Sequence, residues 1–276
     1  MRSELSRIEM ALIRLCRRWQ KHWPIPRGRA IPVRALALLQ RVGLFNPVWH
    51  LADSGFWMHL DPKDLIQREI LTTGGWEPSE TAFLRRRLGR GSAFLDIGAN
   101  IGYFSLVASS LVGTEGSVLS VEPNPRLSNS FHDAIIRNRI TNISLSRVAC
   151  AHDDGVRTLF FGPYSNSGRA SLSAENAMSS AGTPVQCIQA DRLVSDAKMT
   201  RLDLVKIDVE GAELTVLRGL ANTLARFRPS LLIEMEPERL KPFGTSVDDV
   251  RHFLSTFGYI ETPINNGNFA FEVRGN

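Results

Sequence analysis

An α/β fold built on a parallel β-sheet is predicted by three segments in which a short apolar run ends in charge. The runs end in Asp96, Glu122 and Asp208, and short apolar runs of this kind are typical of strands buried on both faces. A glycine-bearing turn and a helical pattern over residues 103–112 separate the first two runs. Strand, turn, helix and strand in this order form a βαβ unit, in which ligands bind beyond the carboxyl ends of the strands.

The turn of this unit, Gly98-Ala-Asn-Ile-Gly102, suits a close approach to a ligand. Its glycines let the backbone come near a bound molecule, and the next helix begins with free N–H groups. Glu122 can accept hydrogen bonds from both hydroxyls of a ribose. A dinucleotide fingerprint has a glycine where this turn has Asn100, whose side chain would obstruct a diphosphate. The spacing therefore favours an adenosine with an amino-acid tail, S-adenosylmethionine.

The third segment carries alternating charges, Lys206, Asp208 and Glu210. In an extended strand these side chains point in one direction. Because three charges buried in the middle of a sheet would be costly, we expect them at a strand end that faces a ligand crevice. A fourth apolar run, over residues 229–235, includes the acid Glu234 near its end.

The other elements follow from local signals. An apolar stretch before Asp61-Pro62 predicts a strand and a turn, and Pro78 predicts the start of a helix. Leucines at positions 214, 217, 220 and 224 predict an amphipathic helix. Ser246 with Asp249 predicts a capping box, and Asn266-Gly267 predicts a terminal hairpin over residues 259–273.

Together these motifs resemble those of the FkbM-type S-adenosylmethionine-dependent methyltransferases. The resemblance spans roughly residues 55 to 260 and lies in Asp96-Ile-Gly-Ala-Asn-Ile-Gly102, Val121-Glu-Pro-Asn-Pro125, Lys206-Ile-Asp-Val-Glu-Gly211 and Leu231-Leu-Ile-Glu234, with Gly75-Trp-Glu-Pro78 and Ser165-Asn-Ser-Gly168. It implies a Rossmann-like class I methyltransferase fold, with a seven-stranded, mostly parallel sheet, helices on both faces and an antiparallel hairpin at the end. It also implies methyl transfer, mostly to oxygen, on a sugar, a glycolipid or another small metabolite.

Residue by residue, the resemblance implies a site for S-adenosylmethionine beside a catalytic group. The expected cofactor-binding residues are Asp96, Gly98, Asn100 and Gly102 at the methionine end, Glu122 at the ribose, and Asp191 after a later strand. Asp208 and Glu210 would face the transferred methyl, and Lys206 would pair with one of them or bind an acidic acceptor. A hydroxyl acceptor must lose its proton, so Asp208 is the first candidate for the base and Glu210 the second.

Metal and nucleic-acid chemistry are disfavoured by the same residues. No pair of histidines and no cysteine shows the spacing of a metal site. Asp208 and Glu234 could share a cation, but pairing with Lys206 or with substrate hydroxyls is the favoured interpretation. Enzymes that methylate DNA bases carry an Asn/Asp-Pro-Pro-aromatic motif at this strand end, and Asp208-Val-Glu-Gly211 differs from it. A non-catalytic regulator that keeps the fold and, less favoured, an NAD-linked oxidoreductase are the alternatives.

Charge divides the chain of 276 residues, whose net charge is +5, into unequal parts. Residues 1–45 form a basic segment of net +8, with an amphipathic helix predicted from Leu5, Ile8, Leu12, Leu15 and Trp19 and a second helix near residues 32–42. Residues 46–90 are a lead-in, and residues 91–276 form the predicted cofactor domain. Three separated cysteines predict a reducing, cytoplasmic setting. The basic segment either packs on the domain or docks on anionic lipid at the inner membrane surface.

Overall fold

The structure is a computed structural model that describes residues 13, 15, 17–19, 48–265 and 267–273. In this part of the chain the central element is a seven-stranded sheet. In spatial order its strands are β11 (Tyr259–Pro263), β12 (Asn268–Val273), β10 (Ser230–Glu234), β9 (Leu204–Ile207), β3 (Ala93–Ile97), β4 (Ser117–Val121) and β5 (Ile143–Ser146). Neighbouring strands are parallel except where β12 pairs with β10 and β11. The mostly parallel sheet with an antiparallel terminal hairpin is therefore confirmed.

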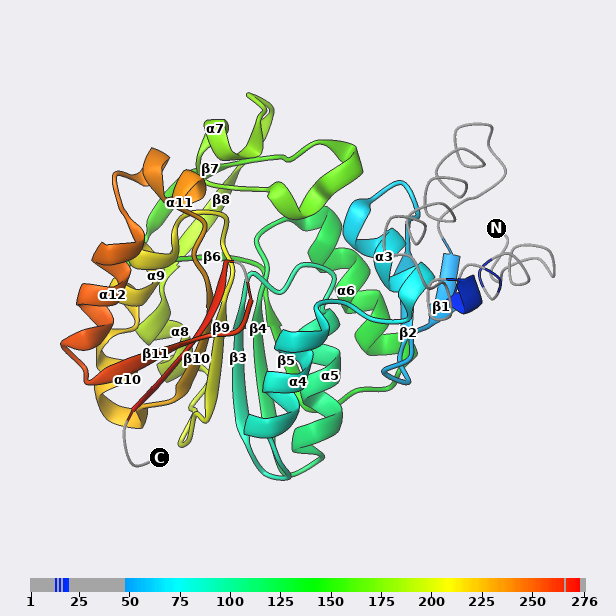
Figure 1. The fold of residues 1–276 in the computed structure, drawn as a ribbon, viewed down its shortest axis with the longest axis horizontal. Helices are drawn as coiled ribbons and strands as arrows, with labels where there is room; N and C mark the ends of the chain where they lie inside the picture. The colour runs from blue at the N-terminus through cyan, green and yellow to red at the C-terminus, as the bar shows by residue number, and fades with distance from the viewer. Residues whose placement is uncertain (1–12, 14, 16, 20–47, 266, 274–276) are drawn as a thin grey trace.

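Helices cover both faces of this sheet (Figure 1), as predicted. On one face lie α4 (Pro78–Arg87), α5 (Tyr103–Val112) and α6 (Pro125–Arg137). On the other face lie α8 (Ala190–Asp196), α9 (Glu213–Gly219), α10 (Ala221–Phe227) and α12 (Val247–Ser255). The remaining helical elements are α3 (Leu65–Thr73), η2 (Tyr164–Arg169), α7 (Ala174–Ala177), α11 (Pro237–Leu240) and η3 (Lys241–Phe243).

The apolar runs form strands because both of their faces are buried. In β3, Phe94 packs with Leu106 of α5 in one core. The next residue, Leu95, packs with Leu217 of α9 in the other core. Successive side chains of a strand point to opposite faces, so a continuous apolar run supplies both cores at once.

Local signals fix several of the boundaries. Pro78 is the first residue of α4, and Ser246 and Asp249 form the predicted capping box at the start of α12. Asn124 caps α6, its side chain accepting a hydrogen bond from the backbone N–H of Arg126 at 3.1 Å. These caps satisfy N–H groups that the first helical turn leaves without a partner.

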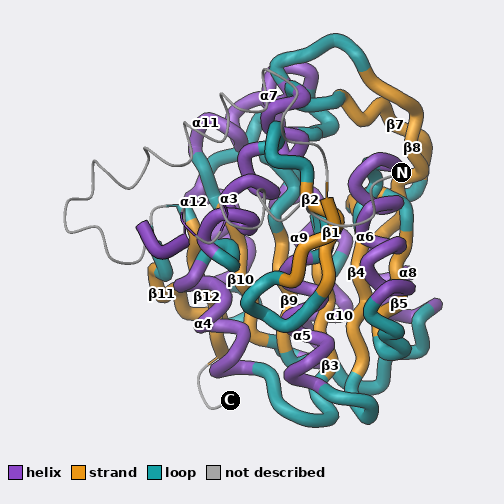
Figure 2. The backbone as a smooth tube through the Cα atoms, turned by 90° about the vertical axis from the view of Figure 1, so that its right-hand side faces the viewer, coloured by secondary structure: helices purple, strands orange, loops and turns teal. Residues whose placement is uncertain are grey.

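A three-stranded sheet, which sequence patterns did not separate from the main one, lies above the carboxyl end of the seven strands (Figures 1 and 2). Its strands are β6 (Ala149–Ala151), β8 (Gly182–Gln189) and β7 (Gly155–Phe160). The chain between β7 and β8 folds into η2, which is tied to α3. The carboxylate of Asp64 accepts hydrogen bonds from the backbone N–H and the hydroxyl of Ser167, at 2.8 Å and 2.6 Å.

The N-terminal predictions fall mostly outside the described residues. Residues 13, 15 and 17–19 are helical, and the helix near residues 32–42 lies outside the described part. Ile13 is buried in the core, whereas Leu15, which belongs to the predicted apolar stripe, is 61% exposed. Arg17 explains this orientation, because it contacts Asp53 at 2.8 Å and His50 at 2.8 Å. These contacts join the helix to the β1 (Val48–Leu51) and β2 (Trp57–Leu60) hairpin. No helix in the described part of the chain is long and apolar enough to cross a membrane.

Candidate functional site

A cleft of about 330 Å³ opens at the carboxyl ends of β3, β4, β9 and β10. Its walls come from the turns after these strands, from the connection between α3 and α4, and from η2 and the chain after it. The small sheet and η2 therefore lie over the edge at which parallel α/β sheets bind their ligands.

The turn after β3 is held by Glu122, which follows β4. One carboxylate oxygen of Glu122 accepts a hydrogen bond from the backbone N–H of Asn100, and the other accepts one from Asn124, both at 2.8 Å. Each oxygen keeps further acceptor capacity. Burial raises the pKa of the Glu122 carboxyl to about 7. Asn100 has a φ of 54°, a left-handed conformation that Asn adopts more readily than most residues.

The two glycines of this turn are required for different reasons. Gly98 has a φ of +86°, and a Cβ on it would lie 1.8 Å from the backbone oxygen of Asp208. Gly98 thus lets the turns after β3 and β9 meet. Gly102, with a φ of +83°, begins α5, and a Cβ there would lie 2.1 Å from the ring of Phe131. The first glycine shapes the cleft, and the second packs a helix against α6.

A buried lysine joins β3 and β9 beneath the cleft. Asp96 and Lys206 are register partners on these strands, and Lys206 is only 3% exposed. Its Nζ lies 2.7 Å from a carboxylate oxygen of Asp208 and 4.9 Å from the ring centre of Phe104. Burial lowers the pKa of Lys206, but the carboxylates of Asp208 and Asp96 outweigh burial and hold that pKa above its usual range. Lys206 is therefore a fixed positive charge.

Asp208 also hydrogen-bonds Glu234, at the end of β10. Burial raises the pKa of Asp208, but Lys206 outweighs it, so the pKa of Asp208 lies below its usual range. The charge of Asp208, followed by burial, raises the pKa of Glu234 to about 11. The pair thus holds one proton, which resides on Glu234, while Asp208 stays ionised.

Glu210 leaves the line of the strand instead of continuing the predicted alternation. Its φ of 56° turns the chain, and its carboxylate forms an ion pair with Arg239, which follows β10 in α11. Burial, reinforced by the charge of Asp208, raises the pKa of Glu210 to about 8. Lys206 and Asp208 share one side as predicted, whereas Glu210 reaches a different partner because β9 ends at Ile207.

Residues that sequence reasoning missed support this turn. The Glu213 carboxylate accepts hydrogen bonds from the backbone N–H groups of Val209 and Gly211, at 3.2 Å and 3.0 Å. The side-chain amide of Asn176 donates to the backbone oxygens of Glu210 and Arg239, both at 2.7 Å. The signal for Glu213 was a carboxylate two residues after a glycine in a turn. Asn176 is distant in sequence and gave no signal.

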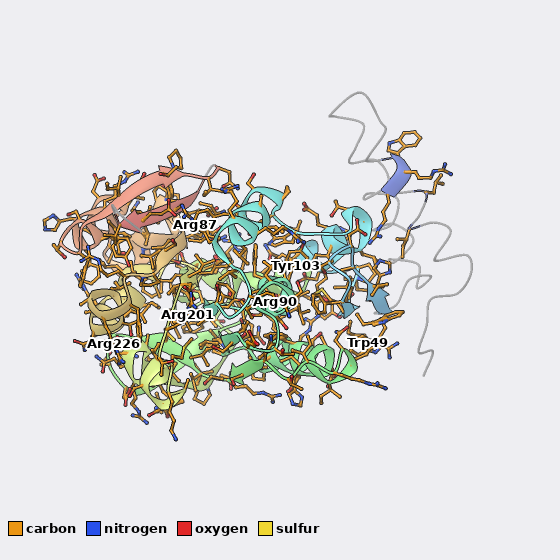
Figure 3. All side chains as sticks on the ribbon, turned by 90° about the horizontal axis from the view of Figure 1, so that it is seen from below. Trp49, Arg87, Arg90, Tyr103, Arg201 and Arg226 are labelled. Atoms are coloured by element: carbon orange, nitrogen blue, oxygen red, sulfur yellow. The ribbon has the colours of Figure 1, made fainter. Side chains whose placement is uncertain are left out.

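Acidic side chains outnumber basic ones in the cleft. Eight charged residues line it: the acids Glu77, Glu122, Asp208, Glu210, Glu234 and Glu236, and the bases Lys206 and Arg239. Both bases are already paired with acids of the same cleft. Arg87, Arg90, Arg201 and Arg226, which Figure 3 labels, do not line the cleft. The cleft therefore attracts cations and repels diphosphates.

The structure brings most of the predicted site residues together. Those lining the cleft are Gly98, Asn100, Glu122, Lys206, Asp208 and Glu210. Asp96 lies just below, where its carboxylate accepts a hydrogen bond from the Ser105 hydroxyl at 2.5 Å. Gly102 lies at the start of α5 and does not line the cleft.

Asp191, which the resemblance predicts near the cofactor, is not part of this group and does not line the cleft. It sits in the first turn of α8. Its carboxylate accepts hydrogen bonds from the backbone N–H groups of Asn222 and Thr223, at 3.0 Å and 2.8 Å, at the start of α10. The strand before it, β8, belongs to the small sheet, and no residue of β8 or α8 lines the cleft.

The described residues contain no group of three or more His, Cys, Asp or Glu side chains that could hold a metal ion. Asp208 and Glu234, the pair considered for a shared cation, hydrogen-bond each other instead.

The family and the curated relatives that this chain matches are methyltransferases. The family described as "Methyltransferase FkbM domain" matches residues 96–261. The chain is 31% identical over 129 residues to hexuronic acid methyltransferase AglP of Haloferax volcanii, covering 47% of this chain and 50% of that protein. It is 28% identical over 147 residues to Methyltransferase 1 of Beauveria bassiana, covering 47% of this chain and 58% of that protein.

The chain thus spans between half and three fifths of the length of these curated relatives. Among solved structures, it is similar to methyltransferase FkbM from Methylobacillus flagellatus, with 16% identity and a TM-score of 0.46. That similarity covers 88% of this chain and 59% of the other.

Proposed function

Because the chain belongs to the FkbM methyltransferase family, we propose that it transfers a methyl group from S-adenosylmethionine to a hydroxyl group of a sugar or a sugar-containing lipid. The observation that carries this proposal is the acidic cleft at the carboxyl ends of the strands, in which six acids face two paired bases. Such a cleft suits a cationic cofactor and a neutral acceptor group.

The residues present fit this cofactor. The outer lone pairs of Glu122 would hold the ribose hydroxyls. Asn100, which lines the cleft, stands where a dinucleotide fingerprint has a glycine. When bound, S-adenosylmethionine supplies a sulfonium methyl group that an in-line nucleophile can take. Carboxylates beside a sulfonium lower the cost of binding it, and Asp208 is held ionised for that purpose by Lys206.

The acceptor would be a neutral hydroxyl at the point of transfer. An acidic group there would meet the carboxylates of Asp208 and Glu210, and the two cations that could neutralise it already have partners. The relative from Haloferax volcanii is named for action on a hexuronic acid, which supports a sugar ring as the acceptor. A ring carboxylate would have to point away from Asp208.

Methyl transfer to simple sugars tests the proposal. The full chain is incubated with S-adenosylmethionine carrying a labelled methyl group and with glucose, galactose, glucuronic acid or a glycolipid extract. The products are examined by mass spectrometry. Label in an O-methyl sugar, together with S-adenosylhomocysteine, supports the proposal. Label on nitrogen or on protein would refute the oxygen assignment. Cofactor binding without any transfer would favour a non-catalytic regulator.

A further inference from the structure

Glu77 has an unusual backbone for a residue that lines the cleft. It directly precedes Pro78 and has a φ of 43° and a ψ of 75°. Residues with a Cβ rarely adopt a positive φ, and a following proline favours extended conformations. Strained residues of this kind persist where surrounding structure enforces them, and they cluster at functional sites. Glu77 lies between Trp76, which also lines the cleft, and the start of α4.

The Glu77 carboxyl is the one cleft acid without a bonded partner in the described part of the chain. Its Oε2 is buried and has no hydrogen-bond partner there. The other five acids of the cleft are all engaged: Glu122 by backbone N–H groups, Asp208 and Glu234 by each other, and Glu210 and Glu236 by Arg239. An unsatisfied buried oxygen is costly, so its retention at a cleft wall points to a bond made with a ligand.

Burial and four charged neighbours together set the pKa of the Glu77 carboxyl. Burial is the main influence and raises the pKa of Glu77 to about 7. Lys206 lowers this pKa, and the acids Asp208, Glu80 and Glu69 raise it. Lys206 and Asp208 lie at the strand end where transfer would occur, whereas Glu69 is in α3 and Glu80 in α4. A base with a pKa near the working pH accepts a proton efficiently.

We infer that Glu77 is the base that removes the proton from the acceptor hydroxyl, an assignment that rests on the proposed methyl transfer. A bond forms between the acceptor oxygen and the methyl carbon, the bond between that carbon and the cofactor sulfur breaks, and the hydroxyl proton passes to Oε2 of Glu77. The products are a methyl ether, a neutral thioether and a protonated Glu77, which returns its proton to solvent. No further reactant is needed.

This assignment gives Asp208 a different role from the one its position first indicated. Asp208 accepts hydrogen bonds from Lys206 and Glu234 and has a lowered pKa, which makes it a weak base. Glu210 is tied to Arg239. Asp208 and Glu210 would act through charge and position, and Glu77 would take the proton.

The test compares Glu77→Gln with the unmodified chain, using labelled S-adenosylmethionine and the sugar that gives the most transfer among glucose, galactose and glucuronic acid. We expect kcat to fall about 10²–10⁴-fold, while calorimetry gives a dissociation constant for S-adenosylmethionine within about threefold of the original. In the unmodified chain kcat should rise with pH through about 7, the pKa of Glu77, and the residual activity of the variant should lose that step.

A second pair of variants separates function from folding. Glu77→Gly removes both the strain and the unpartnered carboxyl, so the melting temperature should stay unchanged or rise while transfer is lost. The matched control is Lys198→Gly, because Lys198 is exposed, has a φ of 52° and lies outside the cleft. It should relieve similar strain and keep full transfer.

The outcomes distinguish this inference from the proposed function. No transfer by the unmodified chain to any of the three sugars or to the glycolipid extract would refute the proposed function and the base assignment with it. Normal kcat in Glu77→Gln would refute the base assignment alone. A more than tenfold loss of cofactor affinity with kcat retained would make Glu77 a cofactor ligand, and a large drop in melting temperature in Glu77→Gly would make it a structural residue.

Discussion

Lys206→Met should destabilise the fold far more than an ordinary surface substitution. Lys206 is 3% exposed and lies among Asp96, Asp208 and Glu77. Methionine is of similar length and keeps the contact with Phe104, so the change removes mainly the charge. Breaking a buried ion pair by removing one partner costs about 3–5 kcal/mol. For a domain of this size that corresponds to a fall in melting temperature of about 6–20 °C.

Urea unfolding at pH 7 would measure this loss, with exposed Lys198→Met as the control. Asp208→Asn added to Lys206→Met should restore part of the stability, because the uncompensated charge is then gone. The loss should also shrink on acidification. The folded-state pKa of Asp208 is lowered, so the stability that it contributes with Lys206 is present above its unfolded pKa of about 3.9 and is lost as the pH falls through the folded value. A loss below about 1 kcal/mol at pH 7, the value typical of exposed pairs, would refute the description of Lys206 as a buried structural charge.

Three further predictions concern the cleft. Gly98→Ala should lower the free energy of unfolding in urea by more than about 2 kcal/mol, since the new methyl would lie 1.8 Å from the backbone oxygen of Asp208. The control is Gly89→Ala, which should be nearly neutral because no atom lies within 4 Å of its new methyl. Asp208→Asn should keep cofactor affinity within about tenfold and lose methyl transfer by about 10²-fold in the labelled-sugar assay, because the charge that positions the reacting groups is lost. Near-normal turnover would contradict this positioning role. The pKa values of the Glu122 and Glu210 carboxyls are raised to about 7 and about 8. The stability that these two protonated carboxyls contribute is therefore present below their ordinary pKa of 4.5 and is lost as the pH rises through 7 and 8. The free energy of unfolding should therefore fall from pH 5 to 8. Binding of cationic S-adenosylmethionine at pH 7 should release protons from these carboxyls, and calorimetry should detect the release as a buffer-dependent heat. Proton uptake on binding would contradict the acidic cleft.

The parallel sheet could be predicted because its signals are local. Apolar runs that end in Asp96, Glu122 and Asp208 each supply both cores and deliver an acid to the same edge. The capping box at Ser246 and the terminal hairpin are also local, and both are confirmed.

What the sequence did not predict depends on contacts between distant segments. Asp191 follows a strand, but whether that strand joins the main sheet is decided by pairing with β6 and β7. The αL conformation of Glu77 and the lack of a partner for its Oε2 are seen only in the structure. Lys206 was expected to pair with Asp208 or Glu210 or to bind an acidic acceptor, and only the structure identifies Asp208 as its partner.

Calorimetric binding of S-adenosylmethionine and NAD, to the unmodified chain and to Glu122→Ala, tests the central claim most directly. The claim is that the cleft beside Glu122 is built for an adenosine with a cationic tail. We expect the unmodified chain to bind S-adenosylmethionine and not NAD at comparable concentrations. Losing charge-assisted hydrogen bonds should weaken cofactor binding about ten- to a hundredfold in Glu122→Ala. Because Glu122 also accepts hydrogen bonds from two backbone N–H groups, circular dichroism is used to check the fold of the variant. We expect the variant to be folded. Tight binding of NAD, or unchanged affinity for S-adenosylmethionine in the folded variant, would contradict the account.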